Sequence, residues 1–497
     1  MANHATGWPE AGTSSLTTPA LAAGTKQKVA LALLLAASLL IKFLIWQQPP
    51  QLFNDSTGYL VPAVGLLDGR GYGAQQNGFR APTYPLFLAA VIAPLDHSMF
   101  SRCRDAHRTA CLAAPSRTPG GRLALRAITA VQASLGLLVT ILLFLIGWQL
   151  TRNTLVALLV GAGYALNVTT AFWEISILTE TLTTFLLVLA IYLTLRPGPQ
   201  PRLARLALGL VLGGLALCHP LYIVSWVIQP AFLFVRGLRS GWRAAAAQVA
   251  PVAAIPALLI ALWSGINYRV NGTFSPSTLG GFVLIQMVAP VVQNAPGGYD
   301  GITQIYVGYR DAMIAETGSF AGTIFRAYPA ILEETGLTWT QLSQKLTALS
   351  LYLIRYYPGT YLSVVAQSNA RFWDHAFYHY GPVPAGLPVL LAGFAADRVQ
   401  DLLNLLFWLA LPALGVVYLF DRRRKLTAGP AVPYAAVLLL AGLVWAAAVF
   451  VALTTFGDNA RYRTSILPLE YGVIVLTAWA GWVTFSSLAG FSPANRD

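Results

Sequence analysis

Charged residues are scarce in this sequence. Asp, Glu, Lys and Arg together make up 10% of its 497 residues, whereas hydrophobic types make up 56% and the mean hydropathy is +0.60. Soluble proteins carry about 25% charged residues, so this composition excludes a string of soluble domains and is typical of an integral membrane protein.

Acidic residues are the rarer kind, with 19 Asp and Glu against 32 Lys and Arg, which gives a net charge of +13. The basic residues stand mainly in short clusters between apolar runs. This pattern is typical of topology signals and of contacts with membrane lipids, so nucleic acid is not an expected partner.

Cysteine is rare as well: the sequence has only Cys103, Cys111 and Cys218, and no CxxC pair. A zinc framework or a thioredoxin-like centre therefore has no support in the sequence. Cys103 and Cys111 share one loop, expected outside the cytoplasm, where they could form a disulfide or stay as free thiols. The first apolar run lacks a small-residue cleavage site, so we expect it to be a retained anchor.

Long apolar runs dominate what is present. The first, 28–46, is long enough at ~1.5 Å per residue to cross a hydrocarbon core of roughly 30 Å, and Lys42 near its far end is expected to snorkel. These runs predict an all-α polytopic membrane protein with about ten transmembrane helices. The other nine are expected at 123–150, 155–172, 179–195, 203–217, 221–235, 244–265, 402–420, 432–454 and 467–485.

The basic clusters set the expected orientation. Those at 196–205, 236–243 and 422–425 fall on one face, which the positive-inside rule assigns to the cytoplasm together with the tails 1–27 and 488–497. Short interfacial helices are expected in the first outer loop. The predicted units are an N-terminal transmembrane module at 28–265 with that loop at 47–122, an extracytoplasmic segment at 266–401 and C-terminal helices at 402–487.

Ionisable residues that are far apart in the sequence share the opposite face under this topology. Because burying a charge beside lipid is costly, such residues are candidates for one functional cavity. They lie in the stretches 55–80, 173–174, 218–220, 266–401 and 457–463.

Asp55 and Arg80 are the leading candidates in the first outer loop. The Asp55 carboxylate could act as a general base for an acceptor hydroxyl, or it could cap the helix expected to follow, because Asn, Asp and Ser all favour an N-cap. Arg80 stands in an extended stretch before Pro82, where its guanidinium could bind a lipid phosphate or only reach the headgroups. Both alternatives remain open for each residue.

Further candidates border the expected spans. Glu174 and Glu180 could bind a sugar hydroxyl, an arginine or a metal, or could serve only as acidic residues at a helix N-terminus. His219 stands at an expected helix break, where a satisfied polar group is the alternative to a functional one. Arg461 and Arg463 could hold a phosphate between them or lie at the membrane interface as anchors.

An ordered set of motifs resembles the GT-C glycosyltransferases of glycosyltransferase family 39, which include protein O-mannosyltransferases and the lipid A aminoarabinose transferase. The set spans most of the chain and is more specific than any single motif. Its members are Asp55-Ser56-Thr57-Gly58-Tyr59, Gly69 with Gly71-Tyr72, the stretch 80–89, Thr179-Glu180-Thr181-Leu182, 209–220, 267–281 and Arg461-Tyr462-Arg463 with Pro468.

The resemblance implies an inverting transferase of a bacterial inner membrane, which moves a sugar from a polyprenyl-phosphate donor to a hydroxyl of a lipid, glycan or protein at the outer face. By analogy Asp55 is the catalytic base. The resemblance assigns the donor and its phosphate to Arg80, Tyr84, His219, Arg461 and Arg463, and the sugar or acceptor to Tyr59, Glu174 and Glu180. Arginines can neutralise the leaving phosphate, so no cofactor is required, although a divalent metal is compatible with the scheme.

Two features depart from the family pattern. Cys218-His219-Pro220 stands where relatives commonly have Arg-Pro, so a titratable group replaces a fixed charge. The insertion at 96–122 is also unusual and leaves the acceptor open. The alternative function is a polytopic lipid or glycan transporter, which would favour inverted halves with broken helices at the midplane.

Overall fold

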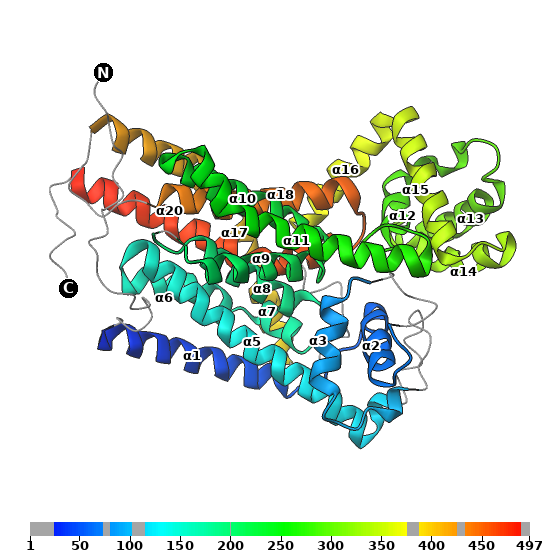
Figure 1. Ribbon diagram of the computed structural model, residues 1–497, viewed down its shortest axis with the longest axis horizontal. Coiled ribbons are helices and arrows are strands. Elements are labelled where there is room, and N and C mark those ends of the chain that lie inside the picture. Colours follow the sequence, from blue (N-terminus) through cyan, green and yellow to red (C-terminus); the bar gives the residue numbers. More distant parts are fainter. Residues whose placement is uncertain are drawn as a thin grey trace.

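The computed structural model describes residues 24–72, 80–101, 115–198, 200–374, 387–424 and 433–488, and it is shown in Figure 1. Within these ranges every regular element is a helix, and the only β contact is an isolated bridge between Gln51 and Ser176. Apolar runs make helices here because a helix satisfies all its own backbone hydrogen bonds, which lipid cannot do. The expected all-α polytopic membrane fold is confirmed. Cys103 and Cys111 lie outside the described residues.

Seven of the described helical segments are long and apolar enough to cross a membrane. An eighth span results if α6 (Thr154–Ala165) and α7 (Val168–Glu174), which are bent by 53° relative to each other, are counted as one. The seven segments are α1 (Thr25–Trp46), α5 (Pro119–Thr151), Pro220–Ser240 with α10 (Ile223–Gly237), α11 (Trp242–Asn271), Arg398–Arg422 of α17 (Leu387–Arg424), α18 (Tyr434–Thr454), and Asn459–Ser487 with α19 (Asn459–Arg463) and α20 (Leu467–Leu488).

Two of the ten expected spans are shorter than the hydrocarbon core of a membrane. Helices α8 (Glu180–Thr194) and α9 (Arg202–Ala216) have 15 residues each, which at ~1.5 Å per residue is about 22 Å and less than the hydrocarbon thickness. α8 is mostly buried and packs against α5, whereas α9 packs against α11 and leaves Leu203, Leu206 and Leu210 exposed on its other side.

The first outer loop forms two short helices, as expected. These are α2 (Asn54–Leu67) and α3 (Thr83–Ile92), which lie at the right-hand end of the bundle beside α5 in Figure 1. They share an apolar core with α5 and α7 that includes Tyr59, Tyr84, Ile128 and Trp173. The loop is therefore packed onto the bundle rather than extended from it.

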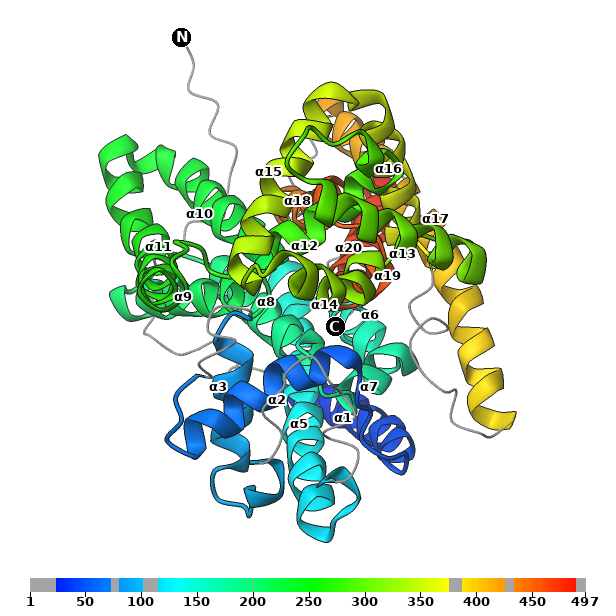
Figure 2. The ribbon, with the colours of Figure 1, turned by 90° about the vertical axis from the view of Figure 1, so that its right-hand side faces the viewer.

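A second helical unit lies at the same end and has its own apolar core, built around Phe282, Tyr306, Ile331 and Leu346 (Figure 2). α11 continues to Asn271 and α17 begins at Leu387, so the long helices extend into both ends of the expected 266–401 segment. The unit comprises α12 (Gly280–Leu284), the 3-10 segment Ile285–Asn294, α13 (Asp300–Thr317), α14 (Thr323–Thr335), α15 (Trp339–Tyr356) and α16 (Pro358–Phe372).

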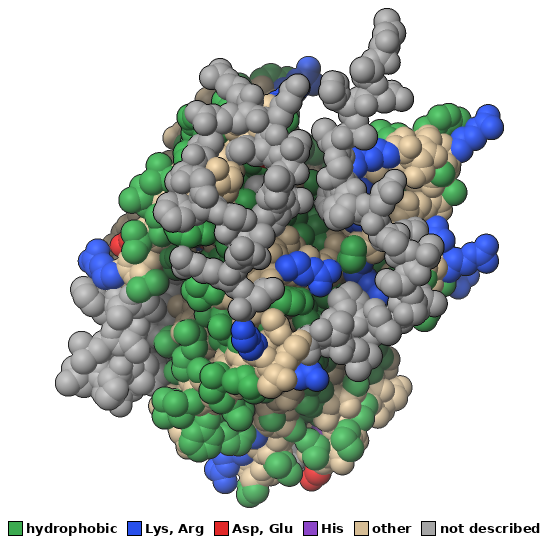
Figure 3. Space-filling view, turned by 90° about the vertical axis from the view of Figure 1, so that its left-hand side faces the viewer, with side chains coloured by type: hydrophobic (Ala, Val, Ile, Leu, Met, Phe, Trp, Pro, Cys, Tyr) green, Lys and Arg blue, Asp and Glu red, His purple; other side chains and the backbone are tan. Residues whose placement is uncertain are grey.

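Basic residues gather at the opposite end of the bundle. Figure 3 shows this end, where many Lys and Arg side chains and few acidic ones lie at the surface. Arg236 donates to the carbonyl of Arg196 (3.1 Å) and Arg205 to that of Ala247 (3.3 Å), so the basic clusters between α8 and α11 lie together. The structure thus separates a basic end from the end that carries α2 and α3.

Candidate functional site

The site begins at the first turn of α2. Phe53 precedes the helix, and its backbone N–H donates to Ser56 Oγ (2.9 Å), which closes the turn. The Ser56 hydroxyl donates in turn to the carbonyl of Ile177 (3.0 Å), and Gln51 pairs with Ser176. Asp55 is therefore not the cap of α2, and the connection between α7 and α8 fixes the turn that carries it.

Asp55 lies between two arginines. Oδ1 is 2.5 Å from Nη2 of Arg80 and Oδ2 is 2.9 Å from Nη2 of Arg461, and the carboxylate is still 30% exposed. Burial works to raise the pKa of Asp55, but the guanidiniums of Arg80 and Arg461 together outweigh it and hold that pKa well below its usual range. At neutral pH the resting carboxylate is ionised and weakly basic.

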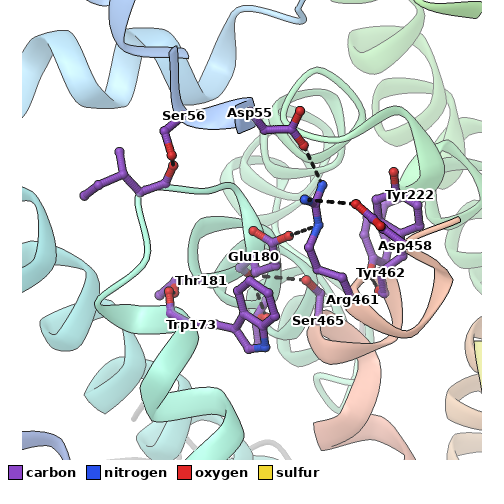
Figure 4. Close-up of polar contacts among 12 residues, drawn as sticks. Asp55, Ser56, Trp173, Glu180, Thr181, Tyr222, Asp458, Arg461, Tyr462 and Ser465 are labelled. Atoms are coloured by element: carbon purple, nitrogen blue, oxygen red, sulfur yellow. Dashed lines mark hydrogen bonds and ion pairs between the residues drawn. The ribbon is translucent and has the colours of Figure 1, made fainter. Parts of the chain in front are cut away.

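Arg461 joins three distant parts of the chain. Its Nε lies 3.0 Å from Oε1 of Glu180, which begins α8, and its Nη1 lies 3.7 Å from Oδ2 of Asp458. Figure 4 shows Asp55 reaching this one guanidinium from above, Glu180 from the left and Asp458 from the right. The side chains of Arg461 and Glu180 are only 6% and 4% exposed, so water hardly reaches this pair, whereas Asp458 is half-exposed.

Arg80 lies over an aromatic surface. Its guanidinium is 4.8 Å from the centroid of the Tyr59 ring, and the Tyr72 hydroxyl donates to its backbone carbonyl (3.0 Å). Burial raises the pKa of Tyr59 to about 12, so this phenol stays neutral beside the guanidinium. Tyr84 contacts the far edge of Tyr59, and its hydroxyl donates to Gln132 Oε1 (2.7 Å). Tyr84 thus packs against Tyr59 and helps to fix the position of its ring.

His219 completes the site. Its ring packs edge-on against Tyr222 (5.6 Å between centroids) and Tyr462 (5.3 Å), directly beside Arg461. Among the described residues, its buried Nδ1 has no hydrogen-bond partner. Burial first, and then the positive charges of Arg461 and Arg80, lower the pKa of His219 to about 3. The imidazole is therefore neutral at pH 7.

This neutral imidazole predicts a pH dependence of stability. The unfolded chain takes up a proton on His219 near pH 6.5, whereas the folded chain does so only at about pH 3, so stability falls as the pH drops between these values. When the pH is lowered from 7.5 to 5, the Tm of the wild type is expected to fall further than the Tm of His219→Gln. Thermal unfolding in detergent checks this, and equal losses in both proteins would contradict it.

Glu174 does not join the group around Asp55. It forms an ion pair with Lys42 inside the bundle, and the Tyr164 hydroxyl donates to the same carboxylate oxygen (2.8 Å). Lys42 is 5% exposed, so the expectation that it snorkels is wrong. Gly136 makes room for the pair, because a Cβ there would lie 2.0 Å from Glu174 Oε1. The bundle core can hold Lys42 since its charge is matched there.

We expect Lys42→Met to lower the free energy of unfolding by about 3–5 kcal/mol, because it leaves the Glu174 carboxylate buried without its counter-charge. Lys42→Met/Glu174→Gln is expected to recover most of this loss. Arg326→Met, which breaks an exposed pair with Glu316, serves as the control and should change stability by less than about 1 kcal/mol. Denaturation in mixed micelles measures all three, and a double variant no better than Lys42→Met would contradict the pairing.

Arg463 also lies outside the group. It is two residues after Arg461 on α19 and forms a buried ion pair with Glu470 on α20. The structure therefore brings together five of the nine residues named from the sequence: Asp55, Tyr59, Arg80, Glu180 and Arg461, with His219 beside them and Tyr84 behind. Glu174 and Arg463 occupy separate buried pairs.

Some residues of the site were not expected from the sequence. Asp458, Tyr462, Gln132 and Ser56 acquire their roles only through contacts between distant segments. Ser56 and Tyr462 stand in the motifs named above and Asp458 in the ionisable stretch 457–463, whereas nothing in the sequence singled out Gln132. Within the described residues, no three His, Cys, Asp or Glu side chains are grouped so that they could hold a metal ion.

Comparisons with known proteins give a distant structural similarity. A scan against protein-family models found no match, and a search of curated proteins found none. Among solved structures, the archaeal oligosaccharyltransferase AglB from Archaeoglobus fulgidus, in complex with an inhibitory peptide and a dolichol-phosphate, matches at TM-score 0.43 and 11% identity over 95% of this chain and 52% of that chain.

The same oligosaccharyltransferase matches in its apo form with the same figures. Tethered with an acceptor peptide containing the NVT sequon, it matches at TM-score 0.43 and 13% identity, over 94% of this chain and 51% of that chain. The chain spans about half the length of these structures, and at TM-scores below 0.5 we base the function on the geometry of the site itself.

Proposed function

We propose that this protein is an inverting GT-C glycosyltransferase, which transfers a sugar from a polyprenyl-phosphate donor to a hydroxyl acceptor at the outer face of the membrane. One observation carries the proposal: α2, the stretch before α3, α8 and α19 bring a partly exposed carboxylate and two guanidiniums to one point. A phosphate needs the guanidiniums, and an attacking hydroxyl needs the carboxylate.

In this scheme Arg80 and Arg461 bind the donor phosphate. The acceptor oxygen attacks the anomeric carbon, the bond from that carbon to the phosphate oxygen breaks, and the electron pair leaves with polyprenyl phosphate. Asp55 takes the hydroxyl proton and later releases it to water. His219 can donate one N–H to the donor, and Tyr59 lies where it can contact the sugar.

The two ion pairs explain why Asp55 is not a strong base at rest. Its carboxylate is bound by the same guanidiniums that the phosphate requires, and these hold its pKa low. A bound phosphate competes for Arg80 and Arg461, which weakens their hold on Asp55 and raises its basicity. Asp55 is therefore a stronger base when the donor is bound than when the site is empty. Without the donor, it takes protons from acceptor hydroxyls less readily.

The remaining residues take supporting roles in this proposal. Glu180 orients Arg461, and Tyr84 orients Tyr59 through their direct contacts. Glu174 holds the connection between α7 and α8 through its pair with Lys42. The separation of the site from the basic end of the bundle supports the proposed outer location, because the positive-inside rule assigns a basic end to the cytoplasm.

A transfer assay tests the proposal. The purified protein is incubated with a panel of radiolabelled polyprenyl-phosphate sugars and with lipid, glycan and protein fractions of the membrane, in the presence of EDTA and of Mg²⁺. Label in one acceptor fraction that depends on one donor supports the proposal, and the EDTA arm tests for a metal. Labelled donor that crosses vesicle membranes without transfer would instead support a transporter.

A further inference from the structure

Arg463 is an almost completely buried arginine with no direct contact to Asp55. Its Nε lies 2.8 Å from Oε1 and its Nη2 lies 2.6 Å from Oε2 of Glu470, in a bidentate pair whose side chains are 2% and 0% exposed. Taking two charges out of water is costly, and hydrophobic residues of similar size would often be as stable. Stability alone therefore gives a weak reason for this pair.

The pair is tied to two other helices. Nη1 of Arg463 donates to the carbonyl of Trp373 at the end of α16 (3.3 Å), and Nη2 donates to Oδ1 of Asn404 on α17. The guanidinium also lies 4.9 Å from the centroid of the Trp373 ring, and Asn404 donates to the same carbonyl (3.0 Å). Arg463 thus joins α16, α17 and α20.

Helix α19 has only five residues and is held at its ends. Asn459 donates to Ser368 Oγ (2.6 Å) on α16, and the Tyr222 hydroxyl donates to the carbonyl of Tyr462 (2.7 Å). Arg461 and Arg463 are two residues apart, or about 200° around a helix, so they point to opposite sides. One side reaches the group around Asp55, and the other reaches Glu470.

We infer that Arg463 is a positioning residue, which fixes the orientation of α19 and so places Arg461 between Asp55 and Glu180. This inference rests on the proposed function, in which Arg461 binds the donor phosphate. A shift of about 1 Å in a group that binds the reacting substrate can lower activity by about 100-fold. The five residues of α19 are too few to hold that tolerance by their own backbone hydrogen bonds, whereas a bidentate pair with two further hydrogen bonds restricts rotation of the helix.

The test compares Arg463→Met, Glu470→Met, Arg463→Met/Glu470→Met and Arg463→Lys. Arg326→Met, at an exposed pair on α14, is the matched control. Each protein is studied as the full chain in detergent by thermal unfolding, by hydrogen exchange of the segment 457–467, and by kcat and KM for the donor.

Arg463→Met and Glu470→Met are expected to lower Tm, to speed exchange of 457–467 at least tenfold, and to lower kcat/KM about 10–100-fold through a raised donor KM. The double variant has no unpaired charge, so its Tm should recover, but its exchange and KM should stay high because the bonds to Trp373 and Asn404 are missing. Arg463→Lys keeps the charge without the bidentate geometry, so its Tm, exchange rate and donor KM should lie between those of the wild type and those of Arg463→Met.

Recovery of Tm, exchange and KM together in the double variant would overturn the inference, because the pair would then serve stability alone. Unchanged exchange of 457–467 in both single variants would overturn it as well. If the wild type transfers no sugar from any donor, the proposed function fails, while the exchange rates still decide whether Arg463 orients α19.

Discussion

Asp55→Asn is expected to lower kcat for sugar transfer by about 10²–10⁴-fold, the usual contribution of a general base. The amide keeps the shape of the side chain and its single oxygen can still accept from one of the two guanidiniums, but it cannot take the acceptor proton. The donor KM should not rise, because the amide competes less than a carboxylate for the two guanidiniums. This combination of a low kcat and an unraised KM distinguishes a lost base from a lost binding group.

The matched control is Asp68→Asn, at the other end of α2. Asp68 pairs with Arg70 and accepts from Ser101 (2.9 Å), away from Arg461, so its variant should keep the wild-type kcat. Steady-state kinetics on both variants, with Tm as a check of folding, make the comparison. A folded Asp55→Asn protein with full activity would disprove the mechanism.

The second large effect is expected at Arg461. Arg461→Met removes a phosphate contact from the site and leaves the Glu180 carboxylate without its guanidinium. The first loss should lower kcat/KM by about 10²–10³-fold. The second should lower the free energy of unfolding by about 3–5 kcal/mol, because Glu180 is 4% exposed and cannot be solvated by water.

A second substitution separates these two effects. Arg461→Met/Glu180→Gln removes both buried charges, so its stability should return towards the wild type while transfer remains lost. Arg461→Lys keeps one charge but cannot reach Asp55 and Glu180 together, and should show intermediate activity. Sugar transfer, donor binding and thermal unfolding are measured on all three variants, and transfer restored in the double variant would show that Arg461 acts on stability alone.

Much of the site could be predicted from the sequence because alternate spans return the chain to the same face. Asp55, Glu180 and Arg461 border different spans, and counting those spans was enough to place them on one face. The local alternative for Asp55, a helix cap, could not be settled this way, because it depended on whether Phe53 or Asp55 precedes the first turn. The structure gives that position to Phe53.

Pairings inside the bundle could not be predicted, because they depend on how helices are rotated about their own axes. Lys42 and Glu174 are 132 residues apart, and nothing local in either sequence points to the other. Likewise, Arg461 and Arg463 are equivalent in the sequence, and only the orientation of α19 separates their roles. Hydropathy located α8 and α9, but it does not show that each has only 15 residues and is shorter than the hydrocarbon core.

The contact between Asp55 and Arg461, which are 406 residues apart, has a consequence for how the protein is made. At about 5–20 residues per second, synthesis needs about 20–80 s to pass from the first residue to the second. During that time Glu180 enters the membrane without the guanidinium that later neutralises it. The bundle therefore stays incomplete until its last helix inserts, and a chain that stops before α19 keeps the Glu180 carboxylate without its counter-charge.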